Sequence, residues 1–151
     1  MLDRFIYLLH WLGFAAFIGA AVAQQHFMAA SARGGVLPAV RDEYEKLSAA
    51  IVTKIELPAL IVQVLSGVMF IAQNSGWMRM GWLHGKLTAV LILLVLAHLE
   101  MFNARAVAKL RQQRGDTAAD EIAKRKKRHV QFGVAGTIAV VAVLGLVAFG
   151  R

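Results

Sequence analysis

The sequence predicts an all-α integral membrane protein, an up-down bundle of four transmembrane helices that forms a single domain over residues 1–151. Two observations predict this fold class. Hydrophobic residues make up 58% of the chain and its mean hydropathy is +0.58, values typical of membrane proteins rather than soluble domains. The net charge of +8 comes from polar connections between apolar stretches, so membrane topology explains it and nucleic acid is not an expected partner.

The first two spans are separated by a polar connection. The first covers about residues 5–30, which is long enough to cross ~30 Å of hydrocarbon at ~1.5 Å per residue. Ala21-Val22-Ala23 imitates a signal-peptide cleavage site, but the stretch stays apolar beyond it and therefore favours a spanning helix. After the connection over residues 31–48, the second span covers about 49–73, and Pro58 is expected to kink it.

The third and fourth spans are separated by a long basic segment. The third span, about residues 81–105, follows a short turn and is therefore expected to run antiparallel to the second. No proline interrupts it through Arg114, so this helix is expected to extend past the membrane. The fourth span, about residues 130–149, contains small residues, and Gly133, Gly136 and Gly145 favour close helix contacts.

The distribution of lysine and arginine predicts the orientation. The connections 31–48 and 103–129 contain twelve of these residues, whereas the two termini and the short turn contain three. Both termini are therefore expected to face outward, into the periplasm of a bacterial-type inner membrane, with the two basic loops cytoplasmic. His129 follows the basic run and is expected at the level of the lipid headgroups.

Histidines supply the strongest metal ligands, because the chain has no cysteine and five histidines. His10 lies early in the first span, and His84 and Lys86 lie early in the third. These spans are parallel in an up-down bundle, so the three side chains are expected at a similar depth. An iron site with His10 and His84 as ligands is geometrically allowed, although interfacial hydrogen bonding explains either histidine equally well.

Helical spacing places two polar stripes on the third span. His98 follows His84 by fourteen residues, which returns the helix to within ~40° of the same face. The same spacing relates Lys86 to Glu100. His84 and His98 resemble the ligand ladder of two-haem cytochromes, but the first span lacks a matching pair, so one haem is expected rather than two.

Three charged side chains are expected toward the inner face, namely Lys54, Glu56 and Glu100. Ion pairing or snorkelling toward the headgroups is the preferred interpretation of this group, ahead of proton transfer.

Several of these residues together resemble a known family. Leu9-His10, Pro58 followed by Gly67, the hexapeptide Trp82 to Leu87 and the following His98 resemble the HemJ-type membrane protoporphyrinogen IX oxidases. The likeness extends to the wider copper-resistance-D-like group of small helical membrane proteins. It covers about residues 5–105, and the tryptophan-x-histidine-x-lysine-leucine piece is its most specific part.

The resemblance implies a four-helix membrane protein that binds b-type haem and oxidises protoporphyrinogen IX to protoporphyrin IX. The family's functional histidine falls on His10, and its lysine falls on Lys86, which is the catalytic candidate. His84 and His98 are further cofactor-binding candidates, and His84 is the natural second iron ligand. The expected partners are a porphyrin or quinone-type small molecule, with a separate acceptor such as quinone taking the electrons, and membrane lipids.

Three other functions remain open from the sequence. One is a membrane haem b electron-transfer protein with a different partner. Another is copper handling, for which Met78 and Met80 beside the outer turn are the only suggestive cluster. The third is an accessory subunit of a membrane complex, since the glycine-bearing fourth span is compatible with a homo-oligomer or with a partner membrane protein.

Overall fold

The computed structural model describes residues 1–149, and all regular secondary structure in this part of the chain is helical, as predicted. In chain order the elements are α1 (Leu2–Ala30), α2 (Pro38–Ile51), the π-helical segment η1 (Val52–Glu56), α3 (Leu57–Gln73), the 3₁₀ turn η2 (Ser75–Arg79), α4 (Gly81–Arg114), the 3₁₀ turn η3 (Gly115–Ala118) and α5 (Ala119–Phe149).

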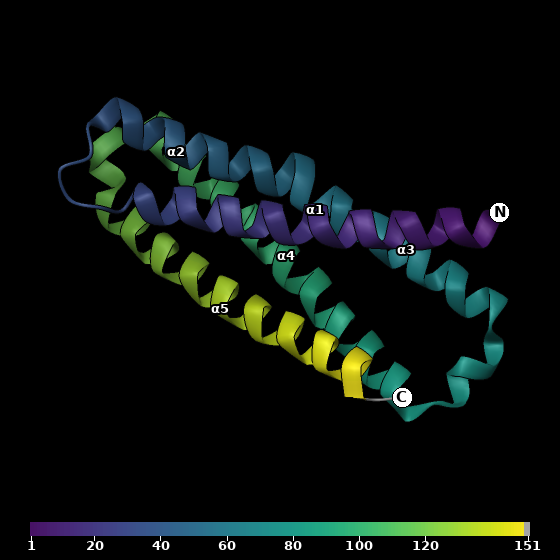
Figure 1. Ribbon diagram of the computed structural model, residues 1–151. Helices are drawn as coiled ribbons and strands as arrows, with labels where there is room; N and C mark the ends of the chain where they lie inside the picture. Colours follow the sequence, from purple (N-terminus) through teal and green to yellow (C-terminus); the bar gives the residue numbers. More distant parts are fainter. Residues whose placement is uncertain (150–151) are drawn as a thin grey trace.

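Three continuous helical stretches are long and apolar enough to cross a membrane, namely Leu2–Ala30, Pro38–Gln73 and Gly81–Phe149. The third stretch contains two helices, because the chain reverses at Gly115 and α5 packs back along α4 (Figure 1). Gly115 has a φ of +52°, a conformation that glycine adopts without the steric cost of a Cβ atom. Before this turn, α4 continues to Arg114, which confirms the predicted extension of that helix.

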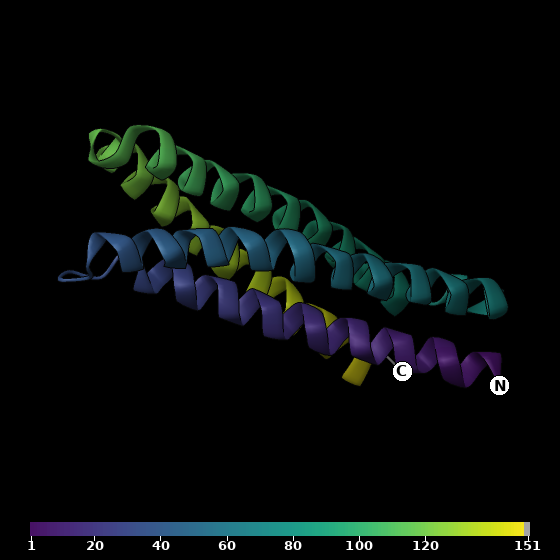
Figure 2. The same cartoon turned by 90° about the horizontal axis from the view of Figure 1, so that it is seen from above.

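The helices pack in two pairs that approach each other most closely at one end. In the first pair α1 packs along the continuous rod formed by α2, η1 and α3, and in the second α4 packs along α5. The pairs lie closer together near the connection between α1 and α2 than near the chain start (Figure 1). Both views place this connection and the η3 turn at one end, and the chain start and η2 at the other (Figures 1 and 2).

A π-helical segment directly precedes Pro58, the residue at which a kink is expected. Proline lacks a backbone N–H and clashes with the preceding turn of an α-helix. The wider turn over Val52–Glu56 precedes Pro58, which lies in the first turn of α3, and the helical path continues through it. Within this segment Glu56 is buried, whereas Lys54 is exposed.

Apolar side chains fill the interior in two clusters. The cluster near the basic connections includes Met28, Val52 and Ile122, and the central cluster includes Phe17, Leu60, Leu93 and Val143, among others. Close helix contact brings α1 against α3, because a Cβ atom on Gly13 would lie 3.0 Å from the backbone nitrogen of Gln63. Because of this close contact, His10, one turn earlier on α1, lies next to the Gln63 carbonyl and the Ser66 hydroxyl of α3.

Candidate functional site

His10 is held by polar groups of α3. Its Nδ1 lies 3.0 Å from the carbonyl oxygen of Gln63 and 3.0 Å from Oγ of Ser66. The ring packs edge-on against Phe70, with centroids 5.9 Å apart, and lies over Gly67, where a Cβ atom would come within 3.5 Å of Cε1. When Nδ1–H donates to the carbonyl, Nε2 keeps its lone pair, which is the usual state of a metal-binding histidine.

Lys86 is the charged residue that approaches His10 from the second helix pair. The Lys86 side chain is half-buried, and it lies close enough for its charge to act on the His10 imidazole. His84 is exposed, with Nδ1 3.2 Å from the carbonyl oxygen of Met80 on its own helix. Two residues correspond to ~200° on a helix, so the two side chains leave α4 on opposite sides. The pairing of His10 and His84 on one iron stays a prediction.

His98 is half-buried on α4, and its Nδ1 lies 2.7 Å from the carbonyl oxygen of Leu94 one turn earlier. This contact fixes the ring against its own helix, as in His84, and with Nδ1 protonated it leaves the lone pair on Nε2. Its part in cofactor binding also stays a prediction.

A buried polar cluster, which the sequence did not predict as a unit, links the two helix pairs. Gln24 is fully buried at its centre: its Nε2 donates to Glu100 Oε2 at 3.1 Å, and its Oε1 accepts from Ser48 at 3.3 Å. The neighbouring Gln25 donates through Nε2 to the other Glu100 oxygen at 2.7 Å, and also to the carbonyl of His129 at 3.2 Å. These bonds satisfy both oxygens of Glu100 inside an apolar environment.

Glu56 extends this cluster from the π-helical segment. It is only 1% exposed and lines the same cavity wall as Glu100. Among residues 1–149 its Oε2 has no hydrogen-bond partner. The expected ion pairing with Lys54 does not occur, because Lys54 is exposed and Glu56 points inward. We call Gln24, Gln25, Ser48, Glu56, Glu100 and His129 the inner cluster.

The structure buries His129 among the helices and does not expose it to lipid headgroups. Its side chain is fully buried, and Nε2 forms a 2.6 Å hydrogen bond with Oε1 of Gln24. The amide oxygen of Gln24 can only accept a hydrogen bond, so Nε2 of His129 carries the ring proton. In the neutral imidazole, Nδ1 then has no proton to donate. Helix α5 begins ten residues before His129 at Ala119, so this residue lies in the third turn and faces the packed interior.

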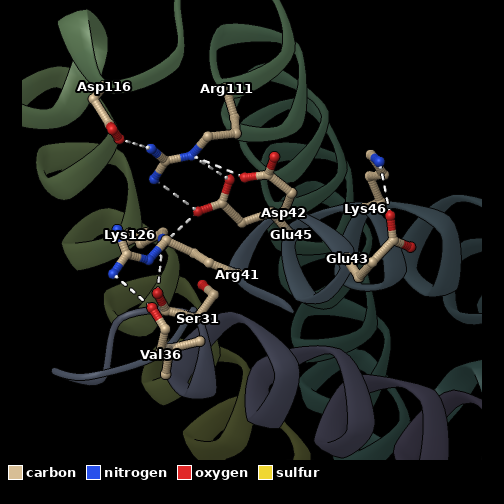
Figure 3. Close-up of polar contacts among 10 residues, drawn as sticks. All are labelled: Ser31, Val36, Arg41, Asp42, Glu43, Glu45, Lys46, Arg111, Asp116 and Lys126. Atoms are coloured by element: carbon tan, nitrogen blue, oxygen red, sulfur yellow. Dashed lines mark hydrogen bonds and ion pairs between the residues drawn. The ribbon is translucent and has the colours of Figure 1, made fainter. Parts of the chain in front are cut away.

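An ion network closes the same end of the molecule (Figure 3). Glu45 is fully buried, and its carboxylate contacts Lys126 Nζ at 2.6 Å and Arg111 Nε at 3.2 Å. Arg111 also contacts Asp116 at 3.0 Å, and Lys126 donates to the carbonyl of Ser31 at 3.1 Å. Burial lowers the pKa of Lys126, whereas its bond to Glu45 raises it. The network joins α2, α4 and α5.

A cavity of about 570 Å³ lies between α1, α4 and α5, with Glu56 of η1 at its wall. Its lining is mostly apolar and includes Phe17, Leu93 and Val140, and its polar members include Gln25, Glu56 and Glu100. The predicted residues His10, His84, Lys86 and His98 do not line it. The inner cluster therefore has its own ligand-sized space, separate from the surroundings of His10.

Within residues 1–149, no group of three or more histidine or carboxylate side chains is arranged to hold a metal ion. Met78 and Met80, the copper candidates, are both exposed, and the sulfur of Met80 accepts a 3.2 Å hydrogen bond from Trp82. A haem needs only one or two axial protein ligands, so the histidines described above remain candidates for that cofactor.

Sequence reasoning missed Gln24, Gln25 and Ser48, although one signal was present. Two adjacent glutamines near the end of an apolar span are costly in hydrocarbon, unless their amides find partners inside the protein. That signal marks the glutamines as buried hydrogen-bonding residues. It does not identify Glu100 and His129 as their partners.

No protein-family model matches this chain, and neither a curated protein nor a solved structure is significantly similar to it.

Proposed function

We propose that this chain is a membrane b-type haem protein that acts as an oxidoreductase, with His10 as an axial ligand. The observation that carries the proposal is the contact of His10 Nδ1 with the Gln63 carbonyl at 3.0 Å. A histidine that ligates a metal usually donates its other ring nitrogen to such an acceptor, which fixes the ring and its tautomer. Bound haem would supply reversible one-electron chemistry at this position.

Lys86 gives the site its substrate preference in this proposal. A half-buried ammonium group near His10 favours a carboxylate, because charge-assisted hydrogen bonds strengthen where water is scarce. Porphyrins of the protoporphyrin class carry two propionate groups. The resemblance of Leu9-His10 and of the segment around Lys86 to HemJ-type enzymes supports protoporphyrinogen IX as the substrate, with a separate quinone-type acceptor.

The membrane arrangement belongs to the same proposal. We infer that α1, the α2–η1–α3 rod, α4 and α5 each cross the bilayer, with the chain start outside and the η3 turn inside. The basic connections lie at one end of the molecule (Figures 1 and 2), and such asymmetry orients membrane proteins. His10 and Lys86 then lie in the outer half, and the inner cluster lies in the inner half.

The absorption spectrum of the purified protein, expressed with adequate haem, tests the cofactor. A Soret band at about one haem per chain is expected, and His10→Ala should abolish or shift it. His26→Ala is the matched control, because His26 is an exposed histidine of the same helix. An unaltered spectrum in His10→Ala, or no Soret band in the parent protein, would reject the assignment.

Rescue of cells that lack their own protoporphyrinogen oxidase tests the reaction. The parent gene should relieve porphyrin accumulation, and Lys86→Met should not, while Lys54→Met serves as a control at an exposed lysine. If haem is bound but rescue fails, the protein is a haem b electron carrier of another kind.

Labelling of single cysteines tests the topology, since the chain has no cysteine of its own. Thr117→Cys in η3 should be protected from an impermeant reagent in intact cells, and Gly76→Cys in η2 should react. Both positions are exposed. The reverse pattern would invert the proposed orientation.

A further inference from the structure

The cavity beside the inner cluster combines an apolar wall with an acidic one. Most of its lining consists of aliphatic and aromatic side chains from α1, α4 and α5, and its volume of about 570 Å³ lies in the range of small-molecule sites. Glu56 and Glu100 line the same space. Such a cavity is suited to a ligand with a large apolar part and one polar group.

The acidic wall lacks a cationic partner. No ion pair among residues 1–149 includes Glu56 or Glu100, and the nearby cations Arg111 and Lys126 are held by Glu45. Glu56 is 1% exposed as a residue, and its Oε2 receives no hydrogen bond from the described residues. A buried carboxyl oxygen without a donor is energetically unfavourable, so the site is incomplete as the protein alone provides it.

The titratable groups around this pair are few. Glu100 lines the cavity with Glu56 but comes from α4, His129 reaches the cluster from α5 through Gln24, and His26 lines the cavity from α1. Lys54 of the same segment is exposed. Two carboxylates on the wall of one apolar cavity repel each other, so they are expected to share a proton until a cation replaces it.

We propose that this cavity binds a lipophilic organic cation, whose charged group sits against Glu56 and Glu100 and whose apolar part fills the space between α1, α4 and α5. Binding releases the proton that the two carboxyl groups share, and the cation restores the charge balance. An anionic porphyrin is disfavoured here by the same carboxyl groups. The site is therefore distinct from the one at His10 and does not depend on the proposed haem.

Calorimetric titration of the detergent-solubilised protein with tetraphenylphosphonium tests the proposal. Saturable binding is expected, with about one proton released per cation, measured by comparing buffers of different ionisation enthalpy. The affinity should fall as the pH falls, because protons compete for the carboxyl pair. The neutral analogue triphenylphosphine oxide should bind at least ~10-fold more weakly, a difference set by the lost charge interaction.

Glu56→Gln should lower the tetraphenylphosphonium affinity by ~10-fold or more, whereas Glu43→Gln, a control at an exposed glutamate, should leave it unchanged. Ala21→Phe fills part of the cavity without touching the carboxyl groups, and should also weaken binding. If circular dichroism shows that Glu56→Gln does not fold, the affinity of Ala21→Phe for tetraphenylphosphonium still tests the proposal.

Three results would overturn the proposal: no saturable binding, equal affinity in the parent and both cavity variants, or equal affinity for the neutral analogue. Glu56-dependent binding of a neutral decyl-quinol in place of the cation would assign the cavity to a neutral ligand instead. None of these measurements uses haem. A negative result for cation binding would therefore not bear on the proposed oxidoreductase function.

Discussion

The two polar regions of this protein are built in opposite ways. The inner cluster and the ion network beside it join α1, α2, α4 and α5 through buried hydrogen bonds and ion pairs, and Gln24 and Glu45 are both fully buried. The region around His10 and Lys86 contains few polar groups, and both of these side chains are only half-buried. The comparison indicates that the inner region maintains the fold, whereas the outer region can change its polar residues without unfolding.

The largest loss of stability is expected from Glu45→Gln. The change leaves Arg111 and Lys126 without the buried carboxylate that holds both, and breaking a buried pair by removing one partner costs about 3–5 kcal/mol. Unfolding in mixed detergent and dodecyl sulfate micelles, followed by circular dichroism, measures the effect. Glu43→Gln removes an exposed carboxylate that pairs with Lys46 and should cost less than about 1 kcal/mol. Equal losses in the two variants would show that the network is not structural.

A smaller but still large loss is expected from Gln24→Leu. Leucine has a similar size, but it removes the bonds to Glu100, His129 and Ser48 together. Each buried polar group left without a partner lowers the free energy of unfolding by about 1–3 kcal/mol. Water or neighbouring side chains that take the place of the lost partner reduce this loss. Gln131→Leu, at an exposed glutamine of α5, is the control in the same unfolding assay. A variant as stable as the control would mean that the inner cluster contributes specificity rather than stability.

The inner and outer polar regions also differ in how much of each could be predicted from the sequence. The helical class, the apolar stretches and the extension of α4 could be predicted, because hydropathy and the lack of proline depend on local sequence. His10 and Lys86 could be singled out because an imidazole and an ammonium are conspicuous in apolar runs. Their approach to each other depends on helix rotation, which packing decides.

The inner cluster could not be predicted for a specific geometric reason. The π-helical segment Val52–Glu56 widens one turn and so changes the face on which Glu56 projects, and no sequence periodicity reveals such a local change. Likewise, the basic neighbours of His129 indicated a surface position, whereas the early start of α5 at Ala119 turns this side chain inward. Pairing across helices is a property of the packed structure.

A moderate loss is expected from Gly133→Ala. The new Cβ atom would collide with the side chain of Gln25, and moving that amide disturbs its bonds to Glu100 and to the His129 carbonyl. The expected cost is about 1 kcal/mol, the scale of one net hydrogen bond. Gly136→Ala is the matched control, because its Cβ atom meets nothing within 4 Å, and it should be neutral or slightly stabilising, since alanine favours helix.

The smallest effect on stability is expected in the outer region, from Lys86→Met. The ammonium group of Lys86 takes part in no ion pair among residues 1–149, and methionine keeps much of the apolar stem, so unfolding should change by less than about 0.5 kcal/mol. The same variant is expected to fail in the rescue of porphyrin oxidation. A residue that matters for activity and not for folding would place the functional site in the outer half. A loss comparable to that of Gln24→Leu would instead show that both regions are structural, and the contrast between them would disappear.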